Sequence, residues 1–254
     1  MIDSLIVTIL VRPLMVALGL LGVVWGGVSL PIVSQSSVLE RTAEHILDGD
    51  PFQVTELIEL LPTIESIERH DYCQPASIRS AAIVRLRLFD EAFSAGDRRL
   101  LDEYMNALEN SVRLALRCSP SDAFLWLTLY RVETVRVGFT SNCLNYLAMS
   151  YRLGPNEGWV ALKRNVLAFS IYQQLPVDLQ EASVNEFVGL VRSGFERETA
   201  NILEGPGWKA RDLLLPRLTV VSERNRQRFA NVLYRDGFDV TIPGIPPYEP
   251  RPWR

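Results

Sequence analysis

The sequence of 254 residues is poor in the side chains on which most catalytic and metal sites depend. It has only two histidines, His45 and His70, and three cysteines, none in a Cys-x-x-Cys or His-Glu-x-x-His spacing. It also lacks the glycine-containing motifs of serine hydrolases, P-loop nucleotidases and dinucleotide-binding enzymes. These absences predict that the protein is not an enzyme and that it has no catalytic residue, no cofactor and no metal site.

An excess of positive charge is missing as well. The chain has 26 Lys and Arg residues against 30 Asp and Glu residues, a formal net charge of −4. Nucleic-acid binding needs a strongly basic surface, so we expect no nucleic acid among the partners. Lysine is almost absent, with Lys163 and Lys209 as the two examples, while the other basic residues are scattered arginines. This bias is typical of a GC-rich genome and indicates a bacterial source.

A long hydrophobic run is present near the N-terminus. Residues 14–33 contain no charged side chain. Twenty helical residues rise about 30 Å, the thickness of the hydrocarbon core of a bilayer. A cleaved secretory signal is the alternative, but its apolar core is shorter and ends in a small-x-small cleavage site, which is not evident after Pro31. We therefore expect an uncleaved transmembrane helix within an N-terminal membrane anchor of residues 1–35.

The residues around this run predict its orientation. Arg12 precedes it and Arg41 follows it, and the N-terminal amino group adds one positive charge on the first side. We therefore expect a single-pass protein of the inner membrane, with a cytoplasmic N-terminus and a periplasmic main domain. Gly22 and Gly26 form a small-xxx-small pair, through which two such helices can associate as a homodimer.

The three cysteines are Cys73, Cys118 and Cys143, so at least one is free unless chains pair. Export would permit a disulfide. The preferred pair is Cys73 with Cys118, because each lies beside a proline at an expected helix boundary. Three buried free thiols are the alternative, and the sequence leaves both open.

After the anchor the pattern is helical, with almost no strand alternation. Capping residues, glycines and prolines predict a series of helices. Their expected ranges are 36–48, 51–61, 76–95, 98–118, 121–137, 140–153, 157–174, 178–203, 208–220 and 222–236. The prediction is an all-α fold in which residues 36–236 form one helical domain. The charged residues of 178–203, including Glu186, are expected on a solvated helix face.

An internal repeat is visible in this region. Two stretches that end helices, Arg117–Pro120 and Arg152–Pro155, lie 35 residues apart, and Trp126 and Trp159 lie 33 apart. A period of about 34 that joins paired helices resembles the tetratricopeptide repeat. The resemblance covers residues 76–203.

Individual residues carry this resemblance. Trp126 occupies the first helix of a unit, Gly138 its end, Ala148 the second helix and Pro155 the exit, whereas Leu129-Tyr130 departs from the expected Leu-Gly pair. The resemblance implies close helix contacts at Gly138 and Ala148 and a role in protein–protein interaction.

The anchored, arginine-rich chain is also similar to accessory proteins of bacterial exopolysaccharide assembly and export. This similarity implies a non-catalytic scaffold or adaptor in a bacterial envelope complex, with the membrane bilayer and other envelope or polysaccharide-assembly proteins as partners. The alternative is a glycan- or peptide-binding module that uses the concave face of the repeat. That alternative requires exposed aromatic rings, with Trp126 and Trp159 as the residues to inspect.

The C-terminal segment, residues 237–254, is rich in proline, with five prolines in the last twelve residues. Proline at this density prevents a helix and favours an extended path. The segment also carries Ile242, Ile245, Tyr248 and Trp253, which we expect to pack back onto the helices. A free recognition peptide is the alternative.

Overall fold

The computed structural model describes the backbone of residues 2–69 and 73–248, and side chains within residues 13–27, 37–69 and 73–248. Every regular element in these ranges is a helix. The prediction of an all-α fold is therefore confirmed for the described part of the chain. Its residues form two compact units, Met1–Pro120 and Ser121–Arg254. The second unit includes the described part of the proline-rich segment, residues 237–248.

Helix α1 (Ile2–Asp48) is continuous, so the prediction of a separate helix beginning at Ser36 or Ser37 is wrong. Serine in a helix interior costs only a fraction of a kcal/mol, roughly 0.5, and does not by itself interrupt a long apolar segment. The last turns of α1 pack against α4 (Pro75–Ala95), with Leu39 and Ala43 buried.

Two short helices, α2 (Val54–Glu59) and α3 (Leu61–Glu68), also pack on α4. The helix expected at 51–61 begins later, because Gln53 and Glu56 form a capping box. Two hydrogen bonds from Arg85 to the Glu68 carboxylate, at 3.0 and 2.7 Å, join α4 to α3. The first unit is therefore built around α4.

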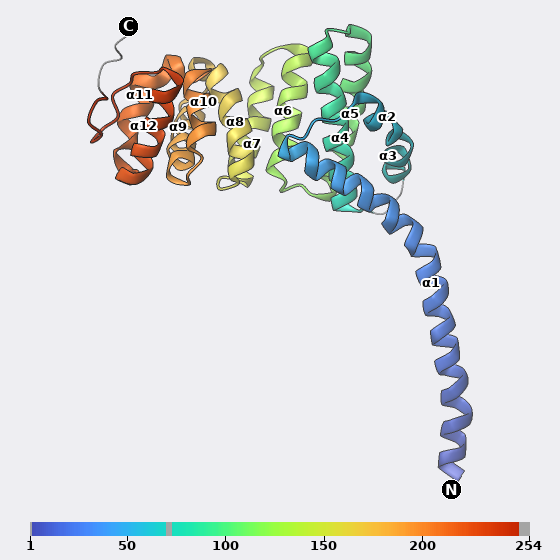
Figure 1. Cartoon of the computed structure of the whole chain (residues 1–254). Coiled ribbons are helices and arrows are strands. Elements are labelled where there is room, and N and C mark those ends of the chain that lie inside the picture. Colours follow the sequence, from blue (N-terminus) through green and yellow to red (C-terminus); the bar gives the residue numbers. More distant parts are fainter. Residues whose placement is uncertain (1, 70–72, 249–254) are drawn as a thin grey trace. The chain divides into compact units, whose positions relative to one another are not determined.

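Helix α4 forms a long hairpin with α5 (Arg98–Cys118) (Figure 1). Gly96 ends α4 at a φ of 70°, and the Asp97 side chain accepts hydrogen bonds from two backbone N–H groups of α5. A disulfide joins Cys73, just before α4, to Cys118 at the end of α5, with Cα atoms 5.8 Å apart. The expected pairing is therefore confirmed, and Cys143 is a buried free thiol.

The second unit consists of successive helix pairs that follow one another in chain order (Figure 1). The pairs are α6 (Ala123–Val137) with α7 (Ser141–Leu153), α8 (Gly158–Ser170) with α9 (Val177–Arg192), and α10 (Glu196–Glu204) with α12 (Glu223–Asp236). Helix α11 (Arg211–Arg217) packs on α9. Short 3₁₀ turns, Tyr172–Gln174, Trp208–Ala210 and Leu218–Val220, complete the connections.

Several helix boundaries of this unit differ from the prediction. The helix expected at 157–174 ends at Ser170, and the one expected at 208–220 is α-helical only over Arg211–Arg217. The single helix expected at 178–203 is divided into α9 and α10 at Gly194, which has a φ of +87°. A positive φ suits glycine and ends a helix. Asp122, not Ser121, caps α6, because its carboxylate accepts from the N–H groups of Phe124 and Leu125.

The expected close contact at Gly138 is wrong. Gly138 has a φ of +77° but open space around it, so backbone conformation is what favours glycine there. Ala148 is partly buried, and its close contact with a facing helix stays a prediction. The close approach lies at Gly154 instead, where an added Cβ would come within 2.5 Å of the Ala123 Cβ.

The chain after α12 folds back onto the second unit. Ile242 and Ile245 are buried in its core, and Tyr248 stacks on Tyr234 with ring centroids 4.2 Å apart. The Tyr248 hydroxyl donates to Asn231. The expected packing is confirmed for these three residues of the tail, whereas Trp253 lies outside the described residues.

Candidate functional site

The exposed part of α1 carries a dense group of uncovered apolar side chains. Nine large apolar side chains between positions 14 and 25 have exposed fractions of 56–75%. No atom lies within 4 Å of a Cβ built on Gly19, Gly22 or Gly26. This segment is therefore not covered by the rest of the described chain.

The structure describes the side chains of only part of the expected span, residues 14–33, because those of residues 28–33 lie outside the described residues. Among the helices that could be assessed, none combines the length and the apolar character that a bilayer crossing requires.

The described residues considered for catalysis or metal binding do not form a cluster. His45 pairs with Asp50 at 2.7 Å on the surface where α1 ends, and His70 lies outside the described residues. Within the described ranges, no group of three or more His, Cys, Asp or Glu side chains could hold a metal ion.

Trp126 and Trp159 are each partly buried. Trp126 stacks on Tyr146 of α7, with ring centroids 6.0 Å apart, and Trp159 contacts Phe124 of α6 at 4.8 Å. Both rings therefore contribute to packing between helices. Neither lines any of the three pockets described below.

A buried polar network connects α7, α8 and α9. The Arg164 side chain is completely buried, and its guanidinium pairs with the carboxylate of Glu186. It also donates to the backbone oxygens of Ser150, at 2.6 Å, and Gly154, at 2.9 Å. Asn165 donates to Glu186 at 3.2 Å. Arg164 therefore ties the end of α7 to α8 and α9.

The electrostatics of this network reflect its burial. Removal from water raises the pKa of the Glu186 carboxyl, while hydrogen bonds from Arg164 and Asn165 act in the opposite direction. Burial also raises the pKa of Tyr151, well above its usual value, and the nearby Glu186 charge acts in the same sense. The Arg164 guanidinium lies 4.3 Å from the centre of the Tyr151 ring. The Tyr151 hydroxyl is buried and makes no hydrogen bond of normal geometry.

A pocket of ≈ 450 Å³ opens beside this network. Tyr151 and Glu186 line its inner part, and it extends past the α7–α8 connection to Phe195. Asn156, Asn185 and Arg192 are exposed lining residues and mark its open side. The pocket thus places hydrogen-bonding groups of both kinds next to one aromatic ring.

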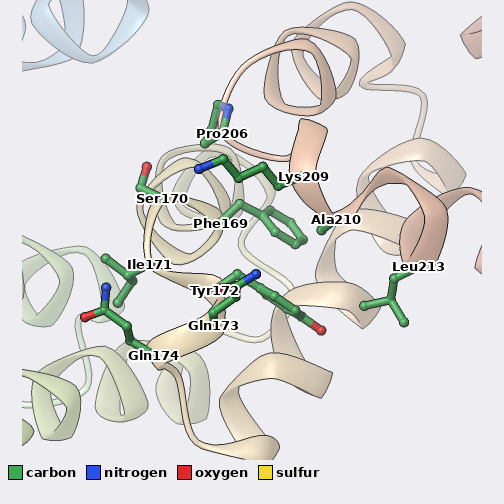
Figure 2. A pocket seen from close by; sticks show the side chains of 10 residues that line it. All are labelled: Phe169, Ser170, Ile171, Tyr172, Gln173, Gln174, Pro206, Lys209, Ala210 and Leu213. Atoms are coloured by element: carbon green, nitrogen blue, oxygen red, sulfur yellow. The ribbon is translucent and has the colours of Figure 1, made fainter.

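Two smaller pockets lie elsewhere in the second unit. Figure 2 shows one of ≈ 320 Å³, around the side chains of Phe169, Tyr172 and Lys209. Lys209 is exposed and is its one charged lining residue. The other, of ≈ 230 Å³, lies between α12 and the folded-back tail and is lined by Tyr234 and Tyr248. Neither contains a buried polar atom without a partner.

Sequence reasoning missed the buried network, because it assigned Glu186 to a solvated face. A signal was present: Glu186 lies three residues after Ser183 and four before Leu190, both buried on the same side of α9.

In comparisons with protein-family models, with curated proteins and with solved structures, no match to this chain is found.

Proposed function

We propose that this chain is a non-catalytic scaffold or adaptor of a bacterial envelope complex, anchored in the inner membrane by its N-terminal helix. Its helical units carry tetratricopeptide-like repeats and bind other proteins of the complex. The process it serves is exopolysaccharide assembly or export, because the anchored, arginine-rich chain is similar to accessory proteins of that process.

The observation that carries this proposal is the uncovered apolar surface of α1. Leu14, Leu21 and Trp25 are among the side chains that leave most of their surface exposed. Moving apolar surface from water into a bilayer is favourable by about 25 cal/mol for each Å² that is covered. The twenty uncharged residues 14–33 have the length of the hydrocarbon core.

The disulfide supports export of the following units. A Cys73–Cys118 bond persists in oxidising compartments and is rare in the cytosol. The successive helix pairs support a binding role, because stacked helical pairs present extended surfaces to partners. Open space beside Gly22 and Gly26 leaves room for a second anchor helix, which is how we propose a homodimer would form.

The anchor is tested by expressing the full chain in a bacterium and separating membranes by flotation. We expect it to float with membranes and to resist extraction at alkaline pH. A double variant, Leu20→Arg with Val23→Arg, should be released, because arginine at the centre of a span costs about 3 kcal/mol each. The matched control is Val177→Arg, which alters an exposed apolar residue of the second unit and should stay in the membrane.

Orientation is tested with alkaline phosphatase fused after Arg254, which is active only when exported. We expect an active fusion, and an inactive cytoplasmic reporter at the same position. Release of the wild-type chain from membranes would contradict the anchor, and the reverse reporter pattern would contradict the orientation.

The envelope role is tested by deleting the gene in its source bacterium. We expect less exported polysaccharide, restored by the wild-type chain but not by the double arginine variant. Unchanged export in the deletion strain would remove polysaccharide from the proposal.

A further inference from the structure

The pocket between α7, α8 and α9 has features that packing alone does not explain. Tyr151 lines it, and its buried hydroxyl lies near the Glu186 carboxylate but makes no hydrogen bond of normal geometry. A buried hydroxyl without a well-formed hydrogen bond destabilises the fold. The adjoining space of ≈ 450 Å³ lies in the range that small-molecule sites occupy. A ligand that bonds to this hydroxyl would remove this destabilisation.

The groups around the pocket define the chemistry of that ligand. The Glu186 carboxylate accepts hydrogen bonds, Arg192 donates them, and Tyr151 and Asn185 can do both. A group that is both donor and acceptor, such as an alcohol, satisfies all of them. Phe195 supplies an apolar surface, and its ring would lie 3.0 Å from a Cβ built on Gly158, so it packs directly over that backbone.

Charge argues against ionic ligands. Glu186 lines the pocket, but its charge is balanced by the buried Arg164, so the inner end offers no net charge to an ionic group. A cationic group would meet Arg192 at the open side. A neutral ligand suits an inner end without net charge and avoids repulsion by Arg192.

We propose that this pocket binds one sugar ring of a neutral glycan, with its hydroxyl groups on Tyr151, Asn185 and Glu186 and its apolar face on Phe195. The inference deepens the proposed function and rests on the part that assigns the protein to polysaccharide assembly. It does not depend on the anchor, because every residue of the pocket belongs to the second unit.

The test uses the full chain in a zwitterionic detergent, since detergents with sugar headgroups would compete. Saturation-transfer NMR with neutral oligosaccharides of glucose, galactose, mannose and N-acetylglucosamine at millimolar concentration detects weak binding. We expect at least one of them to bind. The same experiment with oligosaccharides of uronic acids should show weaker binding or none.

Two variants assign the binding to this pocket. Tyr151→Phe removes one oxygen and should weaken binding about tenfold, the value of one neutral hydrogen bond. Asn185→Ala, at an exposed position, should also weaken it. The control Tyr172→Phe alters a tyrosine of the pocket in Figure 2 and should bind as the wild type does. Circular dichroism of each variant verifies that the helices are intact.

The proposal is overturned if no neutral oligosaccharide binds, if only acidic ones bind, or if both pocket variants bind as tightly as the wild type. A chain that floats with membranes but binds no sugar would refute this inference alone. A chain that binds sugar but does not float would refute the anchor alone.

Discussion

Replacing Arg164 by methionine should destabilise the second unit more than any surface substitution. Methionine has a similar length and fits an apolar site, but it cannot replace the hydrogen bonds to Glu186, Ser150 and Gly154. Because 0% of the Arg164 side chain and 5% of the Glu186 side chain are exposed, the carboxylate would remain buried without its charge partner. Removing one member of a buried pair costs about 3–5 kcal/mol.

Hydrogen-exchange mass spectrometry of the full chain measures this loss where it occurs. Amide protection in α7, α8 and α9 should fall about a hundredfold to a few thousandfold, since each 1.4 kcal/mol corresponds to a factor of ten. Peptides of α4 and α5 in the first unit should exchange as before. The matched control is Arg217→Met, which removes a half-exposed ion pair with Glu181 and should leave protection almost unchanged.

A second substitution identifies the buried charge as the cause. Adding Glu186→Leu to Arg164→Met removes the unpaired carboxylate, so protection should recover by a large part of the loss. If Arg164→Met exchanged like the wild type, the ion pair would contribute nothing to the fold. If the double variant were no better than the single one, lost packing and not the charge would explain the effect.

Three other predictions concern the same unit and use unfolding as their readout. Gly154→Ala should lower the free energy of unfolding by about 1–3 kcal/mol, because its Cβ would overlap that of Ala123. Gly189 lies in a helix with open space around it, so Gly189→Ala should raise the free energy of unfolding by about 0.5–1 kcal/mol. Equal effects of the two substitutions would contradict the close approach at Gly154. Deleting residues 239–254 should lower the melting temperature, because burial of a large apolar side chain such as Ile242 is worth about 1.5–3 kcal/mol before ordering entropy, and an unchanged transition would argue against the packed tail. Burial raises the pKa of the Glu186 carboxyl in the folded state, so its contribution to stability is complete below the unfolded pKa of about 4.3 and is lost as the pH rises through the folded pKa. In urea unfolding, the wild type should therefore lose stability relative to Glu186→Gln over that pH range. A constant difference between the two proteins would refute this prediction.

Local signals in the sequence predicted much of the secondary structure. Gly96 and Asp97 separate α4 from α5 at the expected residues, because a glycine end and an aspartate cap act on the adjacent backbone only. The same holds for the start of α12 at Ser222. Where the prediction failed, as at Gly194, the glycine lay inside a segment predicted as one helix, and its positive φ ends α9 there.

The pairing of Cys73 with Cys118 also followed from neighbouring prolines at helix ends, although only the α4–α5 hairpin brings the two Cα atoms to 5.8 Å. The packing of Ile242 and Ile245 followed from their size, since large apolar side chains gain free energy when they leave water.

The buried network and the pocket depended on the tertiary structure. Tyr151, Arg164 and Glu186 come from three helices, and nothing in their sequence spacing indicates that their side chains meet. The charge of Arg164 suggests a solvated position, and only the contact of α8 with α7 and α9 supplies partners that permit its burial. Helix ends are set by interactions over three or four residues, which a sequence displays directly, whereas a site between helices depends on how separate faces pack.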